Sequence, residues 1–238
     1  MLGAWRTVGI RLAVGALLVT AVLGGWASAR ADDAEDSREL VERARFTLER
    51  FHQDSGMDGF RALMRERARA VLILPQVIRI GFIAGGSGGS GVLMAHSPQG
   101  EWLGPSFYTL YQMNLGILAG AEATEMVILA LTEKGLTSLL STTMKWGADV
   151  SGAVGPVGMG AAAASAGLSA DLVVYSRGKG LYLSFSLDGA VLDVRETLNG
   201  AYYGRSATPI DILVRGEVAN PHAKPLADLL KKLATGQP

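Results

Sequence analysis

One serine in a glycine-rich stretch has the surroundings of a catalytic nucleophile. Gly85, Ser87 and Gly89 fit the pattern G-x-S-x-G, which presents a serine at a sharp turn between a strand and a helix. An acid and a histidine must follow, and Asp211 and His222 come in that order. The apolar residues directly after the pattern, however, are typical of a strand and not of the required helix. A serine hydrolase with Ser87 as nucleophile is therefore a minor alternative.

The same stretch fits a dinucleotide-binding pattern by spacing alone. Gly86, Gly88 and Gly91 fit G-x-G-x-x-G, whose last glycine opens a helix that faces a pyrophosphate. A strand-like run follows here as well, so we expect no nucleotide. The 3 histidines have no second ligand at helical or strand spacing, and there is no cysteine. The sequence therefore predicts no catalytic residues, no metal site and no cofactor.

Cations beside apolar residues indicate a different chemistry, which is attraction to an anionic surface. Lys145 precedes Trp146, an aromatic residue of the kind that prefers membrane interfaces. Arg177 and Lys179 flank a glycine in an expected tight turn. An ordinary solvated charge is the alternative for each. Together they predict a phosphate-binding patch if the fold brings them to one side.

The first 31 residues read as a cleavable secretory signal peptide. Arg6 and Arg11 accompany an apolar run of 14 residues from Leu12 to Gly25, whereas about 20 are needed to span a bilayer. Small residues place cleavage near Ala29 or Ala31. We expect an exported protein of the periplasm or envelope, with a retained anchor as the alternative.

Removing this leader changes the charge balance. The basic residues fall from 22 to 19 while the acidic residues stay at 22, which gives a net charge of −3. Nucleic acid is therefore not expected as a partner, and any attraction to an anionic membrane must come from a local patch.

The rest of the chain predicts an α+β fold. Glycine occurs 31 times, and short apolar runs separated by glycine and proline favour a mostly antiparallel sheet, a partly closed barrel or a sandwich. We expect an amphipathic helical segment at 32–58, the main domain at 59–204 with one short helix near 133–141, and a tail at 205–238 with a last helix. Pro75 is expected to stop the first strand, Ser37 to cap the first helix, and Thr132 to cap the inserted helix.

The first helix carries an apolar stripe with two possible partners. Leu40, Ala44, Leu48 and Phe51 recur at helical spacing. Packing against the domain is the favoured interpretation, and contact with a membrane surface is the alternative.

Ordered motifs between Phe60 and Gly204 resemble the SYLF lipid-binding domain family. They include Ala68 to Pro75, the glycine run Gly85 to Leu93 that resembles the family's glycine hairpin, Glu133 to Leu136, Gly155 to Gly158, Tyr175 to Arg177 and Ala201 to Gly204. So many matches in order are more specific than either enzyme pattern.

This resemblance implies reversible binding of anionic phospholipid without catalysis. Family members in eukaryotes bind phosphoinositides, and some bind actin, which is not expected as a partner of an exported bacterial protein. An envelope protein that docks another protein is the alternative function. In this family, lipid contacts are attributed to basic surface residues and to an amphipathic N-terminal helix. The resemblance implies as matching candidates Lys145, Trp146, Arg177 and Lys179, with Arg43, Arg45 and Arg50 on the helix.

Overall fold

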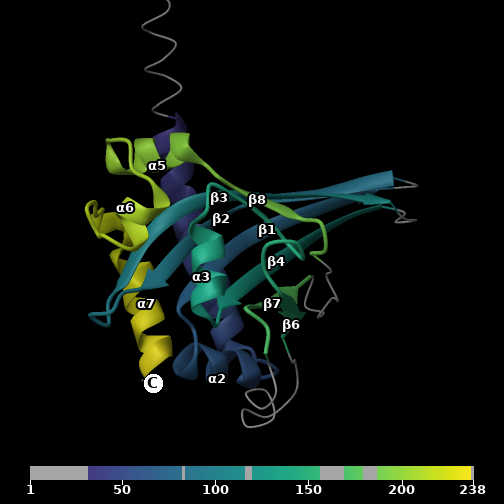
Figure 1. Ribbon diagram of the computed structural model, residues 1–238, viewed down its shortest axis with the longest axis horizontal. Helices are drawn as coiled ribbons and strands as arrows, with labels where there is room; N and C mark the ends of the chain where they lie inside the picture. Colours follow the sequence, from purple (N-terminus) through teal and green to yellow (C-terminus); the bar gives the residue numbers. More distant parts are fainter. Residues whose placement is uncertain (1–31, 82–83, 116–119, 156–168, 179–186, 237–238) are drawn as a thin grey trace, which may run out of the picture.

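A curled eight-stranded sheet with helices at both ends of the chain confirms the predicted α+β class (Figure 1). The computed structural model describes residues 32–81, 84–115, 120–155, 169–178 and 187–236, so the expected signal peptide lies outside the described residues. No helix in these ranges is both long and apolar enough to cross a membrane.

The sheet has the order β5-β8-β3-β2-β1-β4-β7-β6, and the pairings are antiparallel except that of β6 with β7. Its strands are β1 (Ala70–Gly81), β2 (Ala84–His96), β3 (Trp102–Leu115), β4 (Gly120–Ala130), β5 (Thr143–Lys145), β6 (Gly152–Val154), β7 (Leu172–Arg177) and β8 (Val191–Val194). The four long strands β1 to β4 are neighbours and extend away from the helices (Figure 1).

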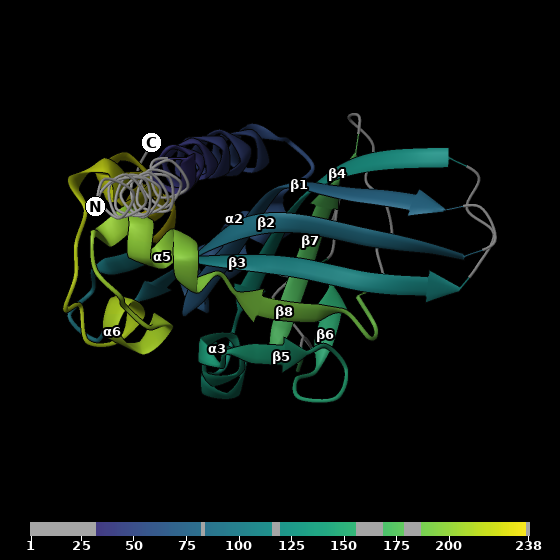
Figure 2. The same cartoon turned by 90° about the horizontal axis from the view of Figure 1, so that it is seen from above.

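The helices lie at the other end of these long strands. A first helix, the N-terminal helix, covers residues 32–53. It is followed by α2 (Asp58–Glu66), α3 (Glu133–Leu140), α5 (Glu196–Tyr203), α6 (Pro209–Leu213), a 3-10 turn η1 (Pro221–Ala223) and α7 (Lys224–Thr235). In Figure 2 the N-terminal helix lies on the side of β4, and α3 and β5 lie on the opposite side.

The sheet separates two hydrophobic clusters, one on each face. We call the outer face the one that carries Ile73 and Val127, which pack with the N-terminal helix, α2 and α7. The inner face carries Leu72 and Met126, which pack with α3, α6 and Trp146. Ala44, Leu48 and Phe51 are fully buried in the outer cluster, so the apolar stripe of the N-terminal helix packs against the domain.

An extra residue in β1 bends the middle of the sheet. Leu74 pairs with Met126 and Val77 with Thr124, so β1 advances by three residues where β4 advances by two. Pro75 and Gln76 occupy this bulge, where a proline is tolerated because it has no amide hydrogen to donate. The prediction that Pro75 ends the strand was therefore wrong.

The glycine run lies within the single strand β2 and does not form a hairpin by itself. The bulge of β1 brings the backbone of β1 close to these glycines. A Cβ atom on Gly89 would lie 2.2 Å from the carbonyl oxygen of Gln76, and one on Gly91 would lie 2.6 Å from that of Ile73. Glycine is required at these two positions because any side chain would meet the neighbouring backbone.

Helix starts were predicted with mixed success. The Thr132 hydroxyl accepts a hydrogen bond from the Gly135 amide (3.0 Å), which confirms the cap of α3. Ser37, in contrast, lies inside the N-terminal helix, and its buried hydroxyl donates to the carbonyl of Ala34. Ser37 is thus not a cap, because the helix already includes residue 32.

Asp171 joins α3 to the segment before β6. Its carboxylate accepts hydrogen bonds from the hydroxyls of Thr132 (2.8 Å) and Ser151 (2.6 Å) and from the Ser151 amide (3.2 Å). These bonds stabilise the ionised form and lower the pKa of Asp171 from 3.8 to about 2. The folded state is therefore stabilised above about pH 4.

This contribution should disappear in acid. Because the pKa is lower in the folded than in the unfolded chain, the stabilisation is lost as pH falls from about 4 towards 2. We expect Asp171→Asn to lower the urea midpoint at pH 5 and to do so less at pH 3. Asp228→Asn, at an exposed Lys224 pair of α7, is the matched control and should change neither midpoint much. An equal loss for Asp171→Asn at both pH values would contradict the charge-based account.

Candidate anion-binding site

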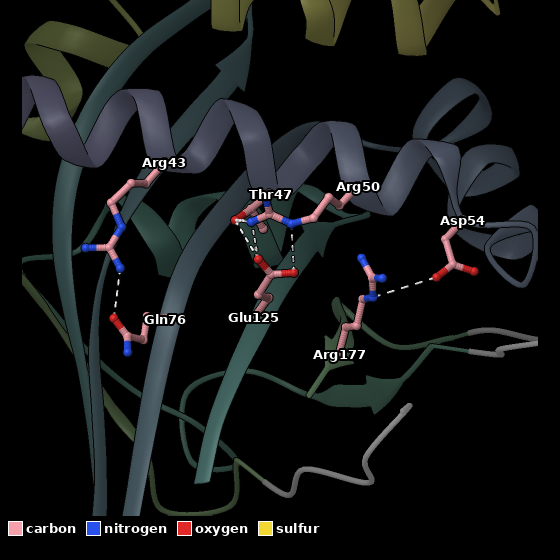
Figure 3. A network of polar contacts seen from close by, with 7 residues as sticks. All are labelled: Arg43, Thr47, Arg50, Asp54, Gln76, Glu125 and Arg177. Carbon is pink, nitrogen blue, oxygen red and sulfur yellow. Dashed lines mark hydrogen bonds and ion pairs between the residues drawn. The ribbon is translucent and has the colours of Figure 1, made fainter. Parts of the chain in front are cut away.

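Three of the predicted basic residues line one groove on the outer face, between the N-terminal helix and the sheet. Arg43, Arg50 and Arg177 border a cavity of about 540 Å³. The other described lining residues are Phe46, Pro75, Gln76, Ala123, Thr124 and Glu125. We call this the arginine groove; its polar network is drawn in Figure 3.

Helical spacing places the two N-terminal arginines together. Arg43 and Arg50 are seven residues apart, so both lie on the same side of the N-terminal helix, next to its buried stripe. Each side chain is 46% exposed. Phe46, also 46% exposed, lies between them in sequence and adds an apolar surface to the groove.

Arg50 is held by a carboxylate from the sheet. Its guanidinium donates to both oxygens of Glu125 on β4 and to the hydroxyl of Thr47, the latter at 3.1 Å (Figure 3). Thr47 is fully buried and donates to Glu125 at 3.4 Å. This network fixes the orientation of Arg50 at the floor of the groove.

Arg177 reaches the groove from β7, directly opposite Glu125 in the β4–β7 pairing. Its Nε lies 3.8 Å from a carboxylate oxygen of Asp54, just after the N-terminal helix (Figure 3). The sheet register thus brings Arg177 to the same side as Arg50, although 127 residues separate them in the sequence.

Arg43 has a neutral partner. Its guanidinium donates to the amide oxygen of Gln76 at 2.8 Å, and the nearest carboxylate oxygen in an ion pair, that of Glu39, lies 3.6 Å away. Gln76 lies at the bulge of β1, which turns it towards the helix. A bound anion would replace an uncharged partner here, so Arg43 is the best placed of the three to bind one.

Counted over its described lining, the groove has an excess of positive charge, while Glu39 and Asp54, which pair with Arg43 and Arg177, lie outside that lining. Its described lining contains three arginines and one glutamate, a formal balance of +2. Guanidinium groups bind phosphate and carboxylate oxygens with two parallel hydrogen bonds. The arrangement can bind an anion, and Phe46 offers an apolar contact beside it.

The other predicted site residues lie elsewhere. Lys145 is exposed at the sheet edge on β5, with β8, β3 and β2 between β5 and β1. Arg45 pairs with Glu42 and Glu49 and lies over the ring of Phe46 (4.2 Å), outside the groove lining. Lys179 is outside the described residues.

The structure corrects the prediction that Trp146 contacts a membrane. The side chain is only 6% exposed and belongs to the inner cluster, so it is not available for shallow insertion into a membrane. A Cβ atom on Gly152 would lie 2.0 Å from its ring, which shows how closely the indole covers that glycine. The two residues are six positions apart, and the turn between them, in which Trp146 pairs with Val150, brings the indole over Gly152.

Ser87 lies in the middle of β2 and not at a turn before a helix. It is buried, and its hydroxyl donates to the Gln112 side chain at 3.3 Å. Asp211 instead caps α6 through Thr208, and His222 contacts Tyr202 and Glu42. The described contacts therefore assemble no catalytic triad from these residues.

Fold and groove together define the class of protein, a curled-sheet domain with arginines in a groove under its first helix. The family model described as "Ysc84: Las17-binding protein actin regulator" matches residues 111–233, just over half of the chain. The chain belongs to this Ysc84 (SYLF) family.

Curated relatives support this assignment. Protein YSC84 of Saccharomyces cerevisiae is 32% identical over 173 residues, 71% of this chain and 37% of the relative. LAS seventeen-binding protein 3 of the same species is 32% identical over 174 residues, 71% and 38% of the two chains. SH3 domain-containing YSC84-like protein 1 of Bos taurus is 29% identical over 157 residues, 65% and 46%. The chain spans less than half the length of these relatives.

Proposed function

We propose that this protein binds anionic phospholipid reversibly at a membrane surface, through the arginine groove. The observation that supports this most strongly is the convergence of Arg43, Arg50 and Arg177 on one cavity that contains a single carboxylate in its described lining. Each basic residue near an anionic leaflet contributes about 1 kcal/mol, so three give weak, reversible binding. In an exported protein, the surface would be that of the cell envelope.

Anchoring would combine charge with a shallow apolar contact. Phe46 is the exposed aromatic residue at the groove and takes the role expected of Trp146. The buried stripe of the N-terminal helix is not needed for this, because only the polar flank of that helix has to face the lipid.

The test is vesicle co-sedimentation with the whole protein. Anionic vesicles of phosphatidylglycerol and phosphatidylcholine are compared with pure phosphatidylcholine, each in low and high salt. We expect binding to the anionic vesicles alone, and its loss in high salt, because salt screens exposed charges. Equal binding to both vesicle types, or none to either, would reject the proposal.

Docking of another protein is the second candidate. It is favoured by the relatives' names, which describe Las17 binding, and by the family description as an actin regulator. Recovery of a crosslinked envelope protein without lipid, or pelleting with actin filaments, would support this candidate over the first.

A further inference from the structure

The outer face of the long strands carries apolar side chains where no described helix covers them. Ile78 and Ile80 on β1 are 41% and 61% exposed, and Tyr111 and Met113 on β3 are 43% and 89% exposed. On the inner face of the same strands, Ser87, Gln112 and Thr124 are buried. The usual distribution of polar and apolar side chains is thus reversed in this half of the sheet, which marks a binding surface.

The exposed apolar residues form the two walls of a trough. Ile78 pairs with Gly88, which pairs with Tyr111, and Ile80 pairs in the same way with Gly86 and Met113. The middle strand therefore contributes no side chain between the walls. Strands lie about 4.8 Å apart, so β1 and β3 are roughly 10 Å apart across a floor of glycine backbone.

This trough begins at basic residues. At the end of the trough that lies next to the N-terminal helix there is a cavity of about 230 Å³. It is lined by Arg43, Gln76, Ile78, Gly88 and Ser90, among others. Arg43 and Gln76 also line the arginine groove, so the two hollows adjoin at these residues. Arg195 lies at the same end and donates to the Ser90 hydroxyl at 3.1 Å.

The chemistry along the trough is that of an amphiphile. Cations stand at one end, and apolar walls follow for roughly 13 Å from Ser90 to Gly86, four residues at about 3.3 Å each. Among the described residues beside the walls, Asp193 has a carboxylate that accepts a hydrogen bond from the Tyr111 hydroxyl (2.8 Å). A trough one strand wide suits a single hydrocarbon chain better than a protein surface.

We propose that the trough holds one acyl chain of an anionic lipid whose phosphate lies at Arg43. This rests on the proposed function and extends it, since the protein would bind an individual lipid molecule and not only a charged surface. The walls Ile78, Ile80, Tyr111 and Met113 contact the chain, and Gly86 and Gly88 leave room for it.

The experiment compares lysophosphatidic acid, kept below its micelle concentration, with glycerol 3-phosphate. Binding to the full chain is followed by NMR. We expect the lysolipid to bind about 200-fold more tightly, which is the ratio that burying four methylene groups gives.

Gly86→Val should lower this ratio by filling the far part of the floor, while the affinity for glycerol 3-phosphate stays unchanged, because Gly86 is not among the described lining residues of the cavity at Arg43. A Cβ atom on Gly86 meets only the Gln112 carbonyl oxygen, at 3.4 Å, which is an ordinary contact. Met113→Glu, at an exposed wall, is a second variant that cannot disturb the core and should lower the ratio as well. Thr143→Val adds the same side chain on β5 and is the matched control.

Four results would overturn the proposal. A ratio that persists in both trough variants would place the acyl chain elsewhere. Vesicle binding or self-association that strengthens in Gly86→Val would indicate that the face inserts into bilayers or joins two copies. A ratio near one in the wild type, with anionic vesicles still bound, would reject the acyl-chain site but leave the proposed function standing. Loss of binding to vesicles and to both ligands would reject the acyl-chain site and the proposed function together.

Discussion

Replacing Arg43, Arg50 and Arg177 together by glutamine should weaken binding to anionic vesicles about 100-fold. The three guanidinium groups line one groove, and at about 1 kcal/mol each their removal costs about 3 kcal/mol of binding free energy. Co-sedimentation over a range of lipid concentrations measures the change. The salt dependence of the residual binding should also become shallower, because fewer charges remain to be screened.

The control removes the same charge elsewhere. Lys145, Arg205 and Lys231 are exposed and lie outside the described lining of the groove. Their triple replacement by glutamine should change the affinity only a few-fold. Equal losses in the two triple variants would mean that net charge alone governs binding, and the groove would then have no special role. Thermal unfolding of both variants shows whether loss of the Arg50–Glu125 pair has altered the fold.

A methyl group at Gly89 should destabilise the protein by about 3 kcal/mol. The added Cβ atom would lie 2.2 Å from the carbonyl oxygen of Gln76 and 3.1 Å from the Val77 Cα, and both neighbours are backbone atoms. Side chains cannot move aside to relieve this contact, so the paired strands must separate, at the upper end of the cost of overpacking. Urea unfolding of Gly89→Ala measures the free energy directly.

The neighbouring glycine provides the matched comparison. On Gly88 the same methyl group meets one atom at 3.4 Å, which is an ordinary contact. Gly88→Ala should therefore be neutral or slightly stabilising, because alanine loses less backbone entropy than glycine on folding. Similar losses for the two variants would show that glycine content as such, and not the approach of β1, determines the stability of β2.

Patterns within a few neighbouring residues correctly predicted the first helix, its buried face and the cap of α3. The stripe of Ala44, Leu48 and Phe51 specifies both the first helix and its buried face, since one helical period matches one surface. Thr132 was identified because a cap depends only on residues three positions away. The prediction for Pro75 was wrong because the effect of this residue is not local. It depends on a bulge in the pairing with β4, which the neighbouring sequence does not reveal.

The candidate site was predicted in part. Arg43, Arg50 and Arg177 were named from charge and resemblance, but their meeting depends on the β4–β7 register. Glu125 and Phe46 were missed because neither has a local signal for a groove. The wall residues Ile78 and Ile80 of the trough were missed as well, because alternation counted through the bulge of β1 assigns them to the inner face.

The bulge at Pro75 and Gln76 sets the phase of everything beyond it. Side chains alternate strictly along a strand, so one extra residue exchanges inside and outside for the rest of β1. Deleting Gln76 would remove the extra residue and leave Val77 opposite Thr124, so Ile78 and Ile80 would stay on the outer face. The extra residue thus lets Leu74 and Val77, three positions apart, face the same side, so the two halves of β1 follow opposite phases of the sequence.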